Sequence, residues 1–410
     1  MSISRPAARV AGREPTEEND RGDDENGDQL ADRATGCLAG AAVGDALGGA
    51  TEGWESREIH AHFDGWVGGI VESIRRSKGI EKPFSPFHKG DGHITDDTLM
   101  TRVLVRAYTE KRDHLDAHDV ERLLLPLIVD EKTWIPELDR EDLLYHRLFL
   151  AEKWLVLKLR YGHADPREAG VGNIVNCGAA MYIAPVGIAN TGDPERAYVE
   201  AIELTGAHQS SYGREAAGVL AACVAEAMQP AATVESVLAV ALDLAKDGTR
   251  TAIEAVASAG GALDGWRDDG LAVLRAAFAP FDSVGEHYAS PAQNARIPSR
   301  LHAIEELPIA LGLLAATGGD CAETVLGGVN YGRDSDSIAS MGGALAGALG
   351  GSEAVPREWV EEVSTASRID VEEAGREMAA IAVEIFEKDV RRHERRARAV
   401  AGLTAGEVPA

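Results

Sequence analysis

Residues 36–52 read Gly-Cys-Leu-Ala-Gly-Ala-Ala-Val-Gly-Asp-Ala-Leu-Gly-Gly-Ala-Thr-Glu, and this stretch indicates how the chain is built. Its small residues predict a helix from Gly36 to Leu47 that ends near Gly48 and Gly49. The whole chain holds 44 glycines but only 5% aromatic residues. Because residues without bulky side chains let backbones approach closely, we expect a core in which helices pack directly against one another.

Helical spacing of apolar residues continues along most of the chain. Helices are expected at residues 97–111, 115–127, 140–159, 195–204, 212–228, 233–245, 249–259, 270–277, 302–317, 322–328, 337–349 and 356–400. The last helix is expected to break near Arg368, and convincing alternating strands are absent. Two loops are long, residues 64–93 and 278–298, and both are candidates to cover a substrate. The sequence therefore predicts an all-α fold of many helices in one compact domain.

The N-terminal segment differs from the rest. From Glu14 to Asp32 there are nine acidic side chains and one arginine, with almost no large apolar residue. Such a segment cannot bury enough surface to offset its ordering entropy. We expect a solvated, mobile tail at residues 1–32, with an acidic interaction tail as the alternative, and one folded domain at residues 33–400.

The formal net charge of −26 over 410 residues limits the partners. Nucleic acid needs a basic face, so neither nucleic acid nor an anionic membrane surface is expected as a partner. No stretch approaches the ~20 apolar residues of a membrane span, and the N-terminus lacks the apolar core of a signal peptide. The four cysteines lie far apart without a CxxC pair, which argues against a disulfide framework or a zinc site. We expect a cytoplasmic protein.

Three acidic clusters lie far apart in the sequence. They are Gly-Asp-Ala-Leu-Gly at residues 44–48 with Glu52, Thr-Asp-Asp-Thr at residues 95–98, and Asp-Ser-Asp-Ser at residues 334–337. Helix capping alone explains single acids and hydroxyls at a helix start. Capping does not require paired carboxylates. Two close carboxylates repel each other, and a bound cation best offsets that repulsion. Carboxylate and hydroxyl oxygens are hard ligands that suit Mg²⁺ or Mn²⁺.

Taken in order, these motifs resemble those of the ADP-ribosylglycohydrolase family. Residues 178–187, Gly-Ala-Ala-Met-Tyr-Ile-Ala-Pro-Val-Gly, resemble the family's phosphate-contacting loop, and residues 205–211, Thr-Gly-Ala-His-Gln-Ser-Ser, resemble its histidine segment. The resemblance spans roughly residues 33–351. It implies a compact all-α fold with two divalent cations, Mg²⁺ or Mn²⁺. It also implies a substrate that is an ADP-ribosylated protein or a small ribosyl conjugate.

The resemblance also implies roles for individual residues. The implied metal ligands are Thr95, Asp96, Asp97, Asp334, Asp336 and Ser337. Glu52 falls at the family's acidic position near the metals, where it would gate the site or act as acid or base. With Glu52, Asp97 and Asp336 form the implied catalytic set, and Asp336 with its neighbours would stabilise positive charge on the ribose ring. A solvated loop carboxylate is the alternative for Glu52.

The implied substrate contacts are Asn173, Gly178, Ala179, Met181, Tyr182 and His208. The usual loop reads Gly-Asn-Gly-Ala-Ala-Met-Arg, and here its arginine is replaced by Tyr182. The loop is four residues longer if the family asparagine is Asn173, or one residue longer if it is Asn176. A tyrosine offers one hydroxyl where arginine pairs with phosphate bidentately, so diphosphate recognition is in doubt.

Several neighbouring residues keep two interpretations. His208 is either a substrate contact or a buried histidine bonded to backbone. Arg333 either restores a positive charge or pairs with a nearby carboxylate. We interpret Cys177 as a packing residue, since no base is seen nearby. The histidines at positions 60, 62, 88 and 93 are interpreted as loop side chains.

Three functions remain. The first is a metal-dependent hydrolase of an N- or O-glycosidic bond at the anomeric carbon of an ADP-ribosyl group. The second is a hydrolase of a free ribosyl or NAD-derived metabolite without the usual diphosphate recognition. The third is a catalytically silent binding protein on the same scaffold. The leaving group, the choice between Mg²⁺ and Mn²⁺, and the oligomeric state stay open.

Overall fold

Two glycine-lined helices lie side by side at the centre of this computed structural model. They are α1 (Gly22–Gly48) and α16 (Ser335–Gly350). Glycines recur at every fourth position of α1 from Gly36 to Gly48, which places them on one helix face. A Cβ added to Gly40 would lie 2.3 Å from the carbonyl oxygen of Gly343. The helices therefore touch through their backbones, and the expected close packing of small residues is confirmed.

The α1–α16 pair is antiparallel. Gly36, early in the pair, lies against Gly347, whereas Gly48 at the end of α1 lies against Ser335. The C-terminal end of α1 consequently meets the N-terminal end of α16. This pairing brings two of the three acidic clusters of the sequence to the same end of the helix pair.

The structure describes residues 22–74, 87–282 and 303–404, and helices dominate this part of the chain. The other helices are α2 (Ser56–Phe63), α4 (Asp96–Lys111), α5 (Ala117–Asp119), α6 (Leu125–Val129), α7 (Leu150–Val156), α8 (Ala184–Ala189), α9 (Pro194–Thr205), α10 (Ser211–Ala227), α11 (Val234–Leu244), α12 (Asp247–Gly260), α13 (Gly270–Phe278), α14 (Ala303–Ala316), α15 (Cys321–Tyr331), α17 (Arg357–Ser367) and α18 (Glu373–Thr404). The expected all-α fold class is confirmed.

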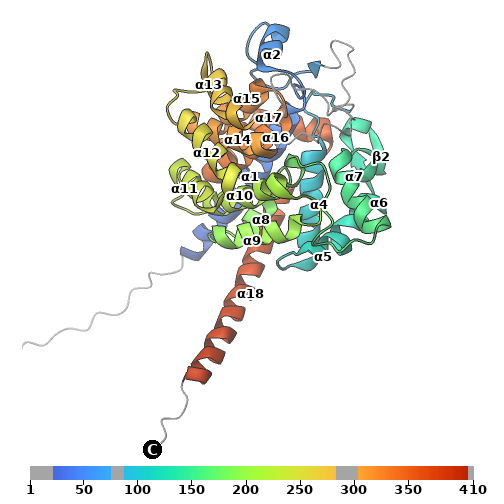
Figure 1. The fold of residues 1–410 in the computed structure, drawn as a ribbon, viewed down its shortest axis with the longest axis vertical. Helices are drawn as coiled ribbons and strands as arrows, with labels where there is room; N and C mark the ends of the chain where they lie inside the picture. The colour runs from blue at the N-terminus through green and yellow to red at the C-terminus, as the bar shows by residue number, and fades with distance from the viewer. Residues whose placement is uncertain (1–21, 75–86, 283–302, 405–410) are drawn as a thin grey trace, which may run out of the picture.

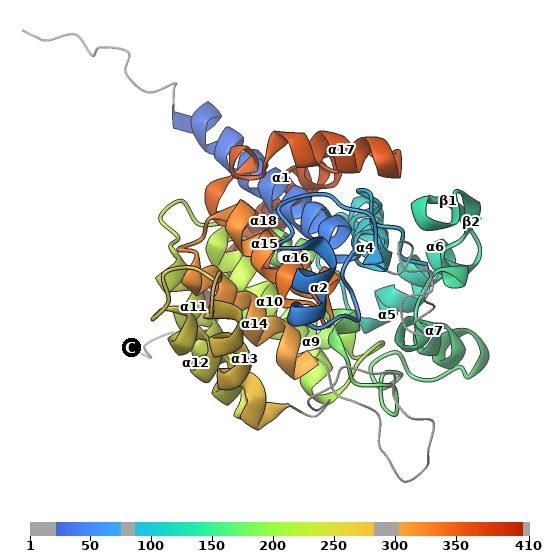
Figure 2. The same ribbon diagram turned by 90° about the horizontal axis from the view of Figure 1, so that it is seen from above.

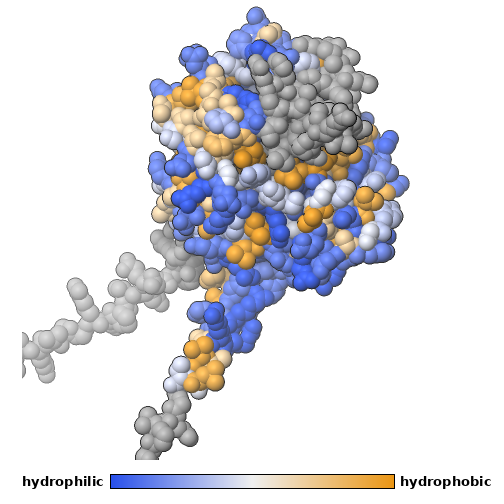
Figure 3. All heavy atoms as spheres, in the orientation of Figure 1, coloured by the Kyte–Doolittle hydropathy of each residue, from blue (hydrophilic) through white to orange (hydrophobic). Residues whose placement is uncertain are grey.

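The remaining helices surround the central pair. Helices α10 and α15 are largely buried, because apolar or small residues occupy most positions around them. Seen from above, α11, α12 and α13 lie on one side of the central helices, and α6, α7 and the small sheet lie on the other (Figure 2). Helix α18 packs against α1 and then projects far from the body (Figure 1). Its projecting part is mostly hydrophilic, with apolar atoms gathered near its end (Figure 3).

One predicted helix is wrong in its first part. Residues 140–159 were expected to be helical, but Arg140–Leu143 forms strand β2, which pairs antiparallel with β1 (Lys132–Ile135). Lys132 faces Leu143 in this hairpin and Ile135 faces Arg140. The hairpin is short and lies at the surface, so its alternation covers too few residues to stand out in the sequence. The predicted break near Arg368 is confirmed, since Arg368 has a left-handed backbone and ends α17.

The helical body begins earlier than the expected boundary at residue 33. Helix α1 starts at Gly22. Within the segment expected to be a tail, Leu30 and Ala31 pack against the core, and Asp32 accepts a hydrogen bond of 3.0 Å from the backbone N–H of Ser352. Residues 1–21 lie outside the described residues, as do residues 75–86 and 283–298 of the two long loops and residues 299–302 after them. In the described part of the chain, no helix is long and apolar enough to cross a membrane.

Candidate active site

Three buried carboxylates converge where α1, α4 and α16 meet. Asp45 lies in the last turn of α1, Asp97 in the first turn of α4, and Asp336 in the first turn of α16. One oxygen of each lies within 4.8 Å of an oxygen of the others. All three are at most 4% exposed. The predicted residues Asp97 and Asp336 are thus brought together, and Asp45 joins them.

Asp45 links α1 to the start of α4. The hydroxyl of Thr95 donates to its Oδ1 at 2.6 Å, and the backbone N–H of Thr98 donates to its Oδ2 at 3.1 Å. The backbone N–H of Thr95 and the hydroxyl of Thr98 donate to the same carboxylate. A carboxylate that accepts the free N–H groups of a helix start stabilises that start. Asp45 was quoted in the first acidic motif, yet only its contacts with α4 show it as part of the site.

Two more predicted residues border the three carboxylates. The hydroxyl of Ser337 donates to Asp97 Oδ1 at 3.1 Å, so α16 and α4 are bonded directly at the site. Asp334 stands before α16 and accepts a contact of 3.3 Å from the Cys177 thiol at its Oδ2. Ser337 thus contacts the three-carboxylate cluster directly, and Asp334 lies two residues before Asp336 of that cluster.

Burial and mutual repulsion shift the pKa values of these carboxyls upward. Burial raises the pKa of Asp45 to about 6, although the hydrogen bonds from Thr95 and Thr98 act to lower it. Burial also raises the pKa of Asp97, and the charges of Asp45 and Asp96 add to the shift. Burial, then the charges of Glu52 and Asp97, raise the pKa of Asp336. Acids that repel one another in a buried space fit divalent cations, because such ions offset both costs.

Asp96 and Thr95 have protein partners in this arrangement. Asp96 Oδ1 lies 3.0 Å from Nη1 of the buried Arg147, which also pairs with Glu137. Thr95 uses its hydroxyl hydrogen on Asp45 and accepts from the Asp97 backbone N–H at 3.4 Å. Arg147 and Glu137 were not predicted as site residues. They come from the segment around the unexpected hairpin, where the sequence offers no motif.

Glu52 is held by a histidine that the sequence interpretation treated as an ordinary loop side chain. His88 is 5% exposed, and its Nδ1 lies 2.6 Å from Glu52 Oε2. Its other ring nitrogen lies 3.7 Å from Asp336 Oδ2. Burial opposes protonation of His88, but Glu52 and Glu137 outweigh it and raise the pKa of His88 to about 9. The two ring nitrogens of His88 thus reach Glu52 on one side and Asp336 on the other.

The predicted substrate contacts lie in a second buried cluster. The Tyr182 and His208 rings stack at 5.8 Å, and the Tyr182 hydroxyl lies 3.1 Å from His208 Nδ1. The side-chain amide of Asn173 donates to the carbonyl oxygens of Ala151 and His208. Of the two interpretations of His208, the structure favours a buried histidine, though it is bonded to the Tyr182 side chain rather than to backbone.

The glycine turn in this cluster has a close acidic neighbour. A Cβ on Gly178 would lie 2.3 Å from Oε1 of the buried Glu152, which itself lies 3.4 Å from His208 Nε2. The backbone N–H of Gly178 donates to the side chain of Asn176 at 3.1 Å. Ala179 and Met181 are buried in the hydrophobic core. The turn thus carries a carboxylate where the resemblance implies phosphate contacts.

Arg333 pairs with carboxylates, which settles its two interpretations. Its Nε lies 2.8 Å from Glu305 Oε1 and its Nη1 lies 3.3 Å from Glu55 Oε1. Arg333 is 1% exposed. The positive charge of Arg333 is therefore paired with carboxylates inside the protein.

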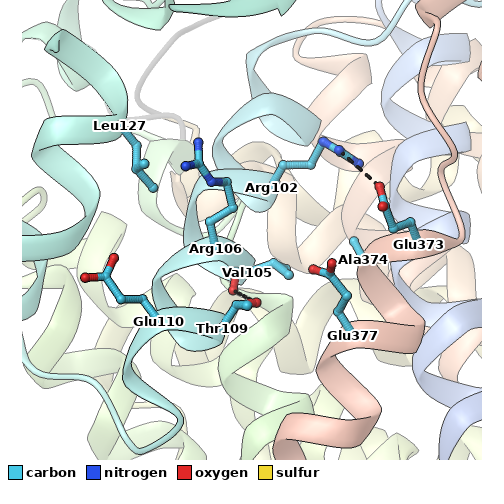
Figure 4. Close-up of a pocket in the computed structure, with 9 residues that line it drawn as sticks. All are labelled: Arg102, Val105, Arg106, Thr109, Glu110, Leu127, Glu373, Ala374 and Glu377. Carbon is cyan, nitrogen blue, oxygen red and sulfur yellow. Dashed lines mark hydrogen bonds and ion pairs between the residues drawn. The ribbon is translucent and has the colours of Figure 1, made fainter. Parts of the chain in front are cut away.

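A surface groove lies elsewhere on α4. This groove of about 440 Å³ is lined by residues of α4 and α18 and by Leu127 of α6, and Arg102 and Glu373 in it form an ion pair at 3.3 Å (Figure 4). None of the predicted site residues lines it. The candidate active site is therefore the carboxylate cluster at the start of α4 and not this groove.

The helical body gathers carboxylate and hydroxyl oxygens at three helix ends, an arrangement that could hold a divalent cation. The chain belongs to the ADP-ribosylglycohydrolase family, whose model matches residues 26–394. Among solved structures, an ADP-ribosylglycohydrolase-related protein complex has 22% identity and a TM-score of 0.54, covering 87% of this chain and 99% of that one. That likeness concerns the fold. Comparison with curated proteins finds no match.

Proposed function

We propose that the protein is a metal-dependent hydrolase that cleaves the glycosidic bond at the anomeric carbon of an ADP-ribosyl group. The observation that carries the proposal is the convergence of Asp45, Asp97 and Asp336 within 4.8 Å of one another in a buried space. Family membership supports an ADP-ribosylglycohydrolase-type hydrolase. The bond, the substrate and the metal requirement are our own assignment.

The proposed cation ligands are Asp97, Asp334, Asp336 and Ser337, with Thr95 and Asp96 at the edge. Asp45 takes part chiefly by holding the start of α4 in place, since its oxygens already accept hydrogen bonds from Thr95 and Thr98. Divalent cations bound there would supply the positive charge that orients ribose hydroxyls and lowers the pKa of water. If Asp96 also served as a ligand, it would exchange its contact with Arg147 for one with a cation.

Glu52 is the proposed proton acceptor. Hydrolysis breaks the bond between the anomeric carbon and the leaving nitrogen or oxygen and adds a water oxygen to the carbon. Glu52 would take a proton from that water and pass it to the leaving atom, so that the carboxylate ends the reaction as it began. His88 orients the Glu52 carboxylate through its 2.6 Å contact. A carboxylate whose orientation is fixed in this way meets the geometric requirement of a general base.

The second candidate is a hydrolase of small ribosides that lack a diphosphate. It is favoured by the buried side chains of His208 and Glu152, which lie against Tyr182 and Gly178 of the segment that resembles a phosphate loop. Tyr182 faces His208 rather than solvent, and the Glu152 carboxylate lies against Gly178. An anion placed beside a buried carboxylate would be repelled.

A product assay tests both candidates. The full chain is incubated with ADP-ribosyl-arginine, ADP-ribosyl-serine, O-acetyl-ADP-ribose and simple ribosides, each with Mg²⁺, with Mn²⁺ or with a chelator. Cation-dependent release of ADP-ribose supports the first candidate. Cleavage of the simple ribosides alone supports the second. No cleavage of any substrate, with cation binding intact, would support a silent binding protein and contradict both.

A further inference from the structure

A further group of side chains that could hold a metal ion adjoins the carboxylate cluster. Cys177, Glu306 and Asp334 each place one ligand atom within 4.8 Å of the others. Cys177 lies in the short turn Cys177–Ala179, Glu306 in α14, and Asp334 directly before α16. The group combines one thiol with two carboxylates from three separate segments. Only Asp334 belongs to the proposed set of oxygen ligands.

Glu306 gives independent evidence for a ligand at this place. Its side chain is 0% exposed, and neither of its carboxylate oxygens has a hydrogen-bond partner among the described residues. Its neighbour Glu305, in contrast, is bonded to Arg333 and Tyr331. A buried carboxylate without hydrogen bonds is costly unless a cation or a proton compensates it.

Cys177 faces the same space. It is 3% exposed, and its sulfur lies 3.3 Å from Asp334 Oδ2 and 3.4 Å from Ser337 Oγ. Cys177 belongs to the hydrophobic core, in line with its interpretation as a packing residue, but its thiol also lies against a carboxylate. A thiolate is a soft ligand that favours Zn²⁺, Co²⁺ or Cd²⁺ over Mg²⁺.

We propose that Cys177, Glu306 and Asp334 form a cation position that accepts a thiophilic divalent ion. The inference rests on the proposed function in one respect, because Asp334 is shared with the proposed oxygen-ligand centre. On binding, the Cys177 thiol gives its proton to solvent and forms a sulfur–metal bond. One thiolate and two carboxylates carry three negative charges, of which the divalent ion offsets two. The hydrolase centre would therefore accept two chemically different cations.

Co²⁺ titration of the metal-free full chain tests the proposal. The wild type is expected to develop the near-ultraviolet charge-transfer absorption of a thiolate–Co²⁺ bond. Cys177→Ser should abolish this absorption, and Glu306→Gln should weaken Co²⁺ binding roughly 10- to 100-fold. Cys223→Ser is the matched control, since Cys223 is also fully buried but its sulfur faces the carbonyl oxygen of Val237 at 3.8 Å. It should keep the wild-type absorption.

Two results would overturn the proposal: no thiolate absorption in the wild type, or equal absorption in Cys177→Ser. Circular dichroism of each variant establishes that it is folded, and Glu306→Gln serves if Cys177→Ser does not fold. Hydrolysis is assayed separately with Mg²⁺. Thiolate absorption without hydrolysis supports this cation position while contradicting the proposed function. Hydrolysis without thiolate absorption supports the proposed function while contradicting this cation position.

Discussion

Asp45 holds two helices together by accepting hydrogen bonds from Thr95 and Thr98. We predict that Asp45→Asn lowers the free energy of unfolding by about 1–3 kcal/mol, because an amide NH₂ would then face buried donors. The measurement is urea unfolding. Asp130→Asn, at an exposed position, is the control and should change stability by less than about 0.5 kcal/mol. Equal stability of Asp45→Asn and wild type would contradict the capping role.

Glu52 carries the proton-transfer step of the proposal. We predict that Glu52→Gln lowers kcat by about 10²–10⁴-fold, the usual contribution of a general acid or base. Cation binding should persist, since Glu52 is not among the proposed ligands. Steady-state kinetics and a cation titration check both expectations. Glu110→Gln, on the far end of α4 and lining the surface groove, should leave kcat unchanged. An active Glu52→Gln enzyme would remove Glu52 from the mechanism.

Of the three converging acids, Asp97 and Asp336 could be singled out from the sequence, but Asp45 and the partners of these acids could not. Asp97 and Asp336 lie in short motifs at predicted helix starts, so their types and positions indicate a role. His88 and Arg147 reach the site from segments without periodicity or motif. Tertiary packing alone determines which loop histidine lies beside Glu52. The same holds for Glu306, which reads as one more acidic residue in a helix.

At the scale of elements, the α1–α16 contact determines where the carboxylates meet. We predict that Gly40→Ala destabilises the protein by about 1–3 kcal/mol or more, the usual cost of overpacking, because its Cβ would lie 2.3 Å from a backbone oxygen of α16. Thermal unfolding measures the effect.

Gly402→Ala is the matched control, because a Cβ there meets nothing within 4 Å. Alanine favours a helix over glycine by up to about 1 kcal/mol, so this variant should be as stable as wild type or slightly more stable. If the two variants behaved alike, the close contact between α1 and α16 would not be the constraint described.

Long helices could be predicted well because their apolar periodicity covers several turns. The expected helix at residues 97–111 is α4, and the expected helix at 195–204 is α9. The hairpin of β1 and β2 was missed, because four-residue strands give too short an alternation. The start of α1 was missed because Gly22 lies in an acidic segment whose composition is typical of an unfolded tail.

At the scale of the whole molecule, the buried acids couple stability to pH. The pKa of Asp45 and that of Asp334 are raised from 3.8 to about 6, in both cases mainly by burial. Between these values the folded state binds more protons than the unfolded state, so stability falls as pH rises. We predict that the metal-free protein loses roughly 1 kcal/mol per pH unit for each such carboxyl between about pH 4 and 6.

Mg²⁺ should reduce this loss, because a bound cation favours the ionised carboxylates. Urea unfolding at about pH 4.5 and about pH 6.5, with and without Mg²⁺, measures the dependence. Stability that rises with pH over this range in the metal-free protein would contradict the account of the buried acids.

The central claim is that carboxylates from separate helices form a divalent cation centre. Isothermal titration of Mn²⁺ into the metal-free full chain tests it most directly. The account predicts saturable binding by the wild type, loss of binding in the Asp334→Ala, Asp336→Ala double variant, and wild-type binding in a control with the exposed Asp268 and Asp269 both changed to alanine. Absent Mn²⁺ binding, or binding unchanged by the Asp334 and Asp336 substitutions, would contradict it.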